Sequence, residues 1–216
     1  MQIGLKECCE ELAGMDDIAL LCHQNPDGDT LGSAFALHYL LRQLGKRSRV
    51  ECADDFPKRY AFLWQEYELE EFSPKFTVAV DVADEQLLGP LADKYMGKID
   101  LCIDHHNSNQ FYAKKTFMRP EAAAVAELVA AIVEEFPQVE LTRQIADCIY
   151  TGISTDTGCF CYSNTTAHTH MVAAEMFKAG CNYAAINYVM FEQKSLSRIA
   201  IEKEVLNTVE YHFNNR

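Results

Sequence analysis

Histidine and aspartate side chains gather in four short, separate segments of the sequence. The six that could bind metal are His23, Asp27, Asp29, Asp81, His105 and Asp156. Carboxylates that pack close together repel one another unless cations lie between them. Imidazole and carboxylate ligands together suit Mn²⁺ and related divalent ions. Two such ions can clamp a phosphoryl group and turn a bridging water into hydroxide near neutral pH, so the set predicts metal-dependent phosphoryl chemistry.

The first segment is HQNPDGDTLGS, residues 23–33, between a strand pattern and a helix pattern. Pro26 fixes one backbone angle, and Gly28 permits a sharp bend. We therefore expect Asp27 and Asp29 to point from one tight turn towards two neighbouring positions. The same residues also suit an ordinary Asn-Pro-Asp-Gly turn without a ligand.

The other three segments follow the same arrangement. Asp81 ends the strand pattern FTVAVD, where a simple strand-end or N-cap aspartate is the alternative. The tripeptide at 104–106, Asp-His-His, follows the strand pattern IDLCI. With average amino-acid composition, this tripeptide would arise by chance in about one chain per hundred or fewer. Asp156 follows a helix pattern, where helix capping is the alternative.

Two residues in or near these segments are candidates for binding a substrate. Gly32 and Ser33 are expected in the first turn of a helix, where free N–H groups attract anions. Asn164 follows the segment of Asp156 and is expected to order its loop. We therefore predict that Ser33 and Asn164 contact the substrate.

Short apolar runs alternate with helical patterns over the first half of the chain. Strands are expected at residues 17–22, 50–53, 76–82 and 99–103, with helices at 30–44 and 87–96. This alternation predicts an α/β fold, a parallel β-sheet flanked by helices. Ligands bind at the carboxyl ends of strands in such sheets, so three of the four segments would meet at one edge.

The second half of the chain has helical patterns only. Helices are expected at residues 121–136, 142–154, 167–179, 183–191 and 195–213. Thr142 is a suitable N-cap for the second of these, and Gly180 ends the third. We therefore expect the sheet to be followed by a helical C-terminal part that ends in a long linker helix.

Composition narrows the classes of partner. The formal net charge of −13 disfavours a grip on long duplex nucleic acid. The nine cysteines form an odd, scattered set, and the N-terminal residues do not resemble a signal peptide. Both features indicate a reduced, cytoplasmic protein. No apolar stretch approaches the ~20 residues of a membrane span.

The four segments resemble, in order, the motifs of the DHH phosphoesterase superfamily. The matching stretches are HQNPDGDTLGS, the aspartate of VAVD, DHHNSN and TGISTDTGCFCYSNTT. They are most similar to the group of bifunctional oligoribonucleases and pAp phosphatases, also called nanoRNases. This resemblance implies hydrolysis of very short oligoribonucleotides or of pAp-type nucleotides with Mn²⁺, for which Mg²⁺ or Co²⁺ can substitute. Family II inorganic pyrophosphatases share the ligand pattern, so pyrophosphate is the alternative substrate.

The resemblance also implies a role for each residue. One ion would take three ligands, His23, Asp27 and Asp81. The second would take four, Asp29, Asp81, His105 and Asp156, with Asp81 shared between the two ions. His106 would contact the scissile phosphate and assist the leaving oxygen. Asp104 would orient a histidine from behind, so His106 and Asp104 are the predicted catalytic residues.

The sequence departs from the family pattern in two places. Relatives usually continue into a substrate-binding domain with a Gly-Gly-Gly-His motif, whereas no two of the ten glycines here are adjacent. We therefore expect a catalytic domain at 1–192 and a linker helix at 193–216. Residues 121–124, Glu-Ala-Ala-Ala, lack the hydroxyl that relatives place near the phosphate.

The alternatives to a phosphoesterase are a catalytically weak metal- or nucleotide-binding module and a metal-free structural domain. The family also suggests a homodimer.

Overall fold

The computed structural model describes residues 1–65 and 67–210. Within them, a six-stranded sheet has the strand order β1-β6-β5-β4-β2-β3, and every strand pair in it is parallel. The strands are β1 (Gln2–Ile3), β2 (Ile18–Leu21), β3 (Ser48–Glu51), β4 (Phe76–Val80), β5 (Leu101–Asp104) and β6 (Lys115–Met118). The expected α/β fold is confirmed.

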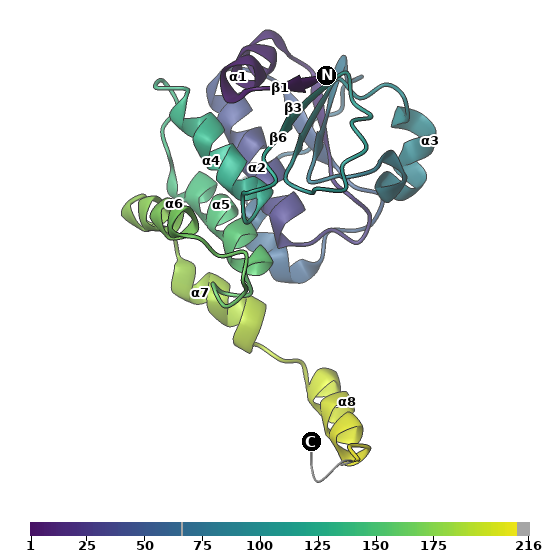
Figure 1. Cartoon of the computed structure of the whole chain (residues 1–216), viewed down its shortest axis with the longest axis vertical. Helices are drawn as coiled ribbons and strands as arrows, with labels where there is room; N and C mark the ends of the chain where they lie inside the picture. Colours follow the sequence, from purple (N-terminus) through teal and green to yellow (C-terminus); the bar gives the residue numbers. More distant parts are fainter. Residues whose placement is uncertain (66, 211–216) are drawn as a thin grey trace.

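Helices connect the strands and make up the C-terminal part of the chain (Figure 1). The α-helices are α1 (Leu5–Gly14), α2 (Gly28–Gln43), α3 (Ala92–Tyr95), α4 (Val125–Glu134), α5 (Arg143–Asp156), α6 (Ala167–Lys178), α7 (Tyr183–Asn187) and α8 (Leu196–Asn207). Two 3₁₀ segments, η1 (Lys58–Trp64) and η2 (Glu85–Leu91), and a π-turn, η3 (Tyr188–Glu192), complete the described elements.

The central strands are buried on both faces, as their continuous apolar runs predict. Alternate residues of each strand enter different cores, because successive side chains point to opposite faces. Leu20 and Val78 pack into the larger core, which also contains side chains of α1, α2, α4 and α5. Leu21 and Ala79 pack into the smaller core with η2 and α3. Because the central strands are buried on both faces, their ends are held at fixed positions.

The helices α2 and α5 cross unusually closely because glycines lie at their contact. A Cβ on Gly32 would collide with the carbonyl oxygen of Cys148. A Cβ on Gly152 would lie 2.6 Å from Oδ1 of Asp29. The close crossing brings the start of α2 next to the end of α5.

Several expected boundaries are wrong. The helix expected at 30–44 begins at Gly28, so Gly32 and Ser33 lie in its second turn and not its first. The helix expected at 121–136 begins only at Val125. The pattern at 87–96 divides into η2 and α3, because Gly89 adopts a positive φ of 57° before Pro90.

The sequence patterns also missed some elements. β1, α1, η1 and β6 were not expected, and the strand expected at 50–53 lies at Ser48–Glu51. Both caps predicted for the C-terminal helices are confirmed: Thr142 accepts a hydrogen bond from the amide of Ile145, and Gly180 follows α6 with a φ of 84°. These contacts fix where α5 begins and where α6 ends.

The C-terminal helix α8 stands apart from the sheet and its covering helices (Figure 1), and none of its residues is buried. The helix expected at 195–213 ends at Asn207, and the last three expected residues, 211–213, lie outside the described residues. The division at 192 and the linker role of this helix stay predictions. Among the described helices, none has the length and apolar character needed to cross a lipid bilayer.

Candidate metal centre

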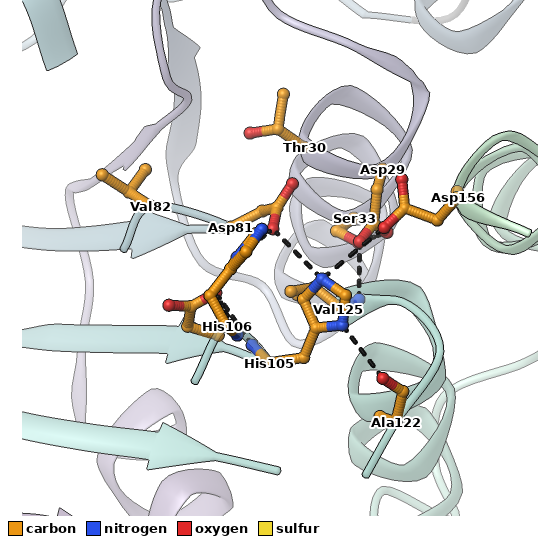
Figure 2. A network of polar contacts seen from close by, with 12 residues as sticks. Asp29, Thr30, Ser33, Asp81, Val82, His105, His106, Ala122, Val125 and Asp156 are labelled. Carbon is orange, nitrogen blue, oxygen red and sulfur yellow. Dashed lines mark hydrogen bonds and ion pairs between the residues drawn. The ribbon is translucent and has the colours of Figure 1, made fainter. Parts of the chain in front are cut away.

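The predicted ligands meet at the carboxyl edge of the sheet. Figure 2 shows four of them, Asp29, Asp81, His105 and Asp156. His23 follows β2, Asp81 comes directly after β4, and 105–106 follow β5. The start of α2 and the end of α5 supply the other carboxylates from the helical layer. Three groups of these residues place their ligand atoms within 4.8 Å of one another: His23, Asp27 and Asp81; Asp29, His105 and Asp156; and Asp81, His105 and His106.

The first group surrounds the imidazole of His23. Its Nε2 lies 3.7 Å from Oδ1 of Asp27 and 3.8 Å from Oδ2 of Asp81. Its Nδ1 lies 2.8 Å from the carbonyl oxygen of Gln24, which can only accept a hydrogen bond. Nδ1 therefore carries the proton of the neutral ring, and the lone pair of Nε2 faces the two carboxylates, as a metal ligand requires.

The second group surrounds His105 in the same way. Its Nδ1 donates to the carbonyl oxygen of Ala122 at 3.0 Å, so Nε2 again carries the lone pair (Figure 2). This Nε2 lies 3.5 Å from Oδ2 of Asp156 and 3.8 Å from Oδ1 of Asp81. Asp81 thus lies between the two histidines, as the shared ligand of the predicted ion pair would.

Two atoms at the centre of this arrangement are buried without a hydrogen-bond partner in the described part of the chain, Oδ1 of Asp81 and Nε2 of His105. Burial raises the pKa of Asp81 well above its usual range, and the carboxylates of Asp29 and Asp27 raise it further. Burial and the same neighbours raise the pKa of Asp156 to about 9. Divalent cations would reverse both shifts and supply the missing partners, so the donor set fits metal.

Asp29 is held in place by the start of α4. Its carboxylate accepts hydrogen bonds from the amides of Val125 at 2.6 Å and Ala126 at 2.9 Å. Ala124, at the N-cap position, offers no side chain for this, so the carboxylate from α2 caps α4 instead. The fully buried Ser33 donates to Asp29 at 3.1 Å. Its hydroxyl therefore lies behind Asp29 and not in the helix-end anion site that the sequence led us to expect.

Asp27 also has a structural role that differs from the expected tight turn. It is the N-cap of α2, and its Oδ1 accepts from the amides of Asp29 at 3.0 Å and Thr30 at 3.1 Å. The helix-capping geometry fixes the carboxylate beside His23. The two aspartates thus face different groups from successive positions of a helix start.

Asp104 and His106 form a hydrogen-bonded pair beside the metal ligands. Nδ1 of His106 donates to Oδ1 of Asp104 at 2.8 Å, and this bond raises the pKa of the imidazole above its ordinary value. Burial alone would raise the pKa of Asp104, but hydrogen bonds from His106 and Asn109 outweigh it and lower the pKa. The side chain of His106 is 46% exposed, so a protonated imidazole is accessible from solvent.

Asp81 has a backbone conformation that aspartate adopts less often than glycine. Its φ is +61°, in the left-handed region. Such a conformation costs on the order of 1–3 kcal/mol and concentrates at functional sites. Its amide donates to the carbonyl of Ile103 at 3.0 Å, which ties the turn after β4 to β5. The strain is therefore located at a residue that is shared by two of the candidate groups.

Asn164 connects the loop after α5 to the start of α4. Its Nδ2 lies 3.1 Å from the carbonyl oxygens of both Ala123 and Asp156. This contact agrees with the expected ordering of the loop, while direct substrate contact stays a prediction. Asn109, which sequence reasoning missed, donates to Oδ2 of Asp104 at 2.6 Å and is buried.

The fold and this site define a parallel α/β protein with a candidate histidine–aspartate metal centre at the carboxyl edge of its sheet. The model of the DHH family, N-terminal domain, matches residues 17–153. The chain belongs to the DHH family.

Curated relatives carry more specific names. The chain is 34% identical over 203 residues to the bifunctional oligoribonuclease and PAP phosphatase NrnA of Thermus thermophilus, covering 91% of this chain and 60% of that protein. It is 25% identical to the protein of the same name from Bacillus subtilis, covering 88% of this chain and 68% of that one. The chain therefore spans about 60% of the length of its Thermus relative.

Solved structures share the fold. An exopolyphosphatase-related protein from Bacteroides fragilis superposes with a TM-score of 0.85 at 21% identity, covering 96% of this chain and 66% of that one. A putative family II inorganic pyrophosphatase from Methanococcus jannaschii gives 0.59 at 18% identity, covering 80% and 61%. At these identities, the superpositions establish the arrangement of strands and helices.

Proposed function

We propose that this chain is the catalytic part of a metal-dependent phosphoesterase that hydrolyses short oligoribonucleotides and pAp-type nucleotides. The observation that carries the proposal is the position of Asp81. Its buried carboxylate lies between the imidazoles of His23 and His105, whose Nε2 lone pairs both face it. The names of the curated relatives support the same activity and substrates.

The proposed ligand sets follow the two groups described above. His23, Asp27 and Asp81 would hold one divalent ion. Asp29, Asp81, His105 and Asp156 would hold the other. When bound, two ions such as Mn²⁺, with Mg²⁺ or Co²⁺ as substitutes, would supply an activated water and positive charge for the phosphate oxygens. The carbonyls of Gln24 and Ala122 keep both histidine rings in the tautomer that the ions require.

The pair formed by His106 and Asp104 handles the leaving group. Asp104, kept ionised by its hydrogen bonds, holds the proton on Nδ1 and stabilises the charged ring. The exposed Nε2 of His106 then donates a proton to the oxygen that leaves phosphorus. Residues 121–124 add no hydroxyl to this site, so His106 is the main protein donor proposed here for the substrate phosphate.

The charge of the chain limits the length of the substrate. Two divalent ions would neutralise much of the carboxylate charge inside the site, while the rest of the chain stays acidic. A short nucleotide needs only the site itself, whereas a long duplex needs an extended basic surface. We therefore propose a nucleotide-sized substrate.

A panel of substrates tests the proposal. With Mn²⁺, the chain is expected to hydrolyse pAp and RNA of two to five nucleotides faster than pyrophosphate. Asp81→Ala is expected to lose hydrolysis together with bound Mn²⁺, measured by elemental analysis after gel filtration. Faster turnover of pyrophosphate would make it the substrate instead. Metal binding by the unmodified chain without turnover of any compound would identify a binding module.

A further inference from the structure

A cavity of about 380 Å³ lies between the start of α4, the segment after β6 and the start of α6. Apolar side chains of Leu128 and Ala131 line it together with the polar side chains of Arg119, Glu127 and His168. Its volume falls within the usual range of small-molecule sites. None of the candidate metal ligands lines it among the described residues.

The carboxylate of Glu127 is the unusual feature of this cavity. Glu127 is only 3% exposed, and within residues 1–65 and 67–210 its Oε1 is buried without a hydrogen-bond partner. The buried carboxylate of Asp17, by contrast, pairs with Arg47 and Lys75. A buried carboxylate without partners is strongly unfavourable. A bound molecule with N–H donors would supply the partner that Oε1 of Glu127 lacks within the described residues.

The cavity and the metal centre share one wall. Ala122 lines the cavity, and its carbonyl oxygen accepts the hydrogen bond from Nδ1 of His105 (Figure 2). The segment from Arg119 to Ala122 follows β6, whose carboxyl end lies beside that of β5 in the sheet. A nucleotide with its phosphate at the metal centre would therefore have this cavity as its neighbour.

We propose that the cavity binds the base of the nucleotide substrate and favours guanine, an inference that rests on the proposed phosphoesterase function. The flat faces of a base suit the apolar walls formed by Leu128 and Ala131. A bare cation would meet the positive charge of Arg119 in the same cavity, which the carboxylate of Glu121 and the hydroxyl of Thr166 also line. A neutral, planar molecule with N–H donors on its edge fits both features.

Guanine matches a carboxylate best among the four bases. Its N1–H and N2–H₂ groups are adjacent and donate in parallel to the two oxygens of Glu127. Adenine and cytosine present one amino group beside an acceptor nitrogen, which would face the second oxygen. Uracil presents a single N–H between two carbonyl groups, which a carboxylate repels. A matched bidentate pair of this kind changes affinity by about tenfold or more.

The test compares diguanylate and diuridylate RNA with bis(p-nitrophenyl) phosphate, which has no base. The unmodified chain is expected to show a kcat/KM for diguanylate about tenfold or more above that for diuridylate. Glu127→Gln is expected to bring this ratio near one. Glu134→Gln, on the exposed face of the same helix, makes the same charge change and is expected to keep the ratio.

Two further measurements separate the possible failures. Ala131→Met fills the cavity without changing charge and is expected to lower the ratio of kcat/KM for diguanylate to that for bis(p-nitrophenyl) phosphate. Glu127→Gln is also expected to raise the urea midpoint, because it replaces a carboxyl group whose buried Oε1 has no hydrogen-bond partner among the described residues. If Glu127→Gln leaves the ratio of kcat/KM for diguanylate to that for diuridylate unchanged, the proposed base site is wrong. If no phosphoester is hydrolysed, the proposed function fails, and calorimetric binding of GMP against UMP decides the base site alone.

Discussion

Gly152→Ala tests how the crossing of α2 and α5 positions the metal centre. The new Cβ would lie 2.6 Å from Oδ1 of Asp29 and 2.6 Å from Cβ of Ala126, where ordinary contacts begin at 3.4 Å. Asp29 or the helix must therefore move by about 0.8 Å, the difference between these two distances. Such a shift weakens or breaks the hydrogen bonds of 2.6 and 2.9 Å that Asp29 accepts from α4.

The expected magnitude follows from these contacts. Overpacking costs about 1–3 kcal/mol, while alanine gains about 1 kcal/mol over glycine inside a helix. The net loss in the free energy of unfolding is therefore small, about 0–2 kcal/mol. The loss of metal affinity is larger: displacing a ligand from its supporting contacts typically costs 10–100-fold. We expect this loss at the proposed ion held by Asp29 and His105.

Calorimetric titration with Mn²⁺ measures the affinity, and urea unfolding in EDTA measures the stability. Gly14→Ala is the control, because Gly14 lies at the end of α1 with no neighbouring atom within 4 Å of a new Cβ. It is expected to leave Mn²⁺ binding unchanged. Unchanged Mn²⁺ binding by Gly152→Ala would refute the close-crossing argument.

Three further predictions concern other parts of the chain. Burial holds the pKa of His38 at about 4 instead of 6.5, so the unfolded chain binds a proton that the folded protein does not. As the pH falls from 6.5 towards 4, the free energy of unfolding therefore decreases by about 3 kcal/mol. Urea unfolding of His38→Gln is expected to show a weaker pH dependence. Asn109→Leu removes a donor from Asp104 and is expected to lower kcat about tenfold while elemental analysis finds the metal content unchanged. Thr166→Ala removes the capping box of α6 and is expected to lower the free energy of unfolding by about 1 kcal/mol.

Local patterns predicted the middle of the sheet and the meeting of its strand ends. The strands before His23, Asp81 and His105 are apolar runs buried on both faces, a signal that needs no long-range information. Since parallel strands end at one edge, the grouping of these three residues follows from the order of elements. The structure confirms that they lie within a few ångströms of one another.

Long-range contacts account for what the sequence could not predict. β1 has only two residues and exists through its pairing with Thr116 and Phe117, more than a hundred residues away. α4 begins at Val125 because Asp29, from another helix, caps its amides. Asn109 is the last residue of the matching stretch DHHNSN, but the stretch gives it no role, and only the fold directs its amide to Asp104.

Anomalous diffraction at the manganese edge from crystals soaked in Mn²⁺ tests whether Asp81 lies between two bound ions. Two peaks are expected on either side of Asp81, one beside Nε2 of His23 and the other beside Nε2 of His105. Soaked crystals of Asp81→Ala should lose both. Peaks at other residues, or none at this edge of the sheet in the unmodified chain, would contradict the assignment of the metal centre.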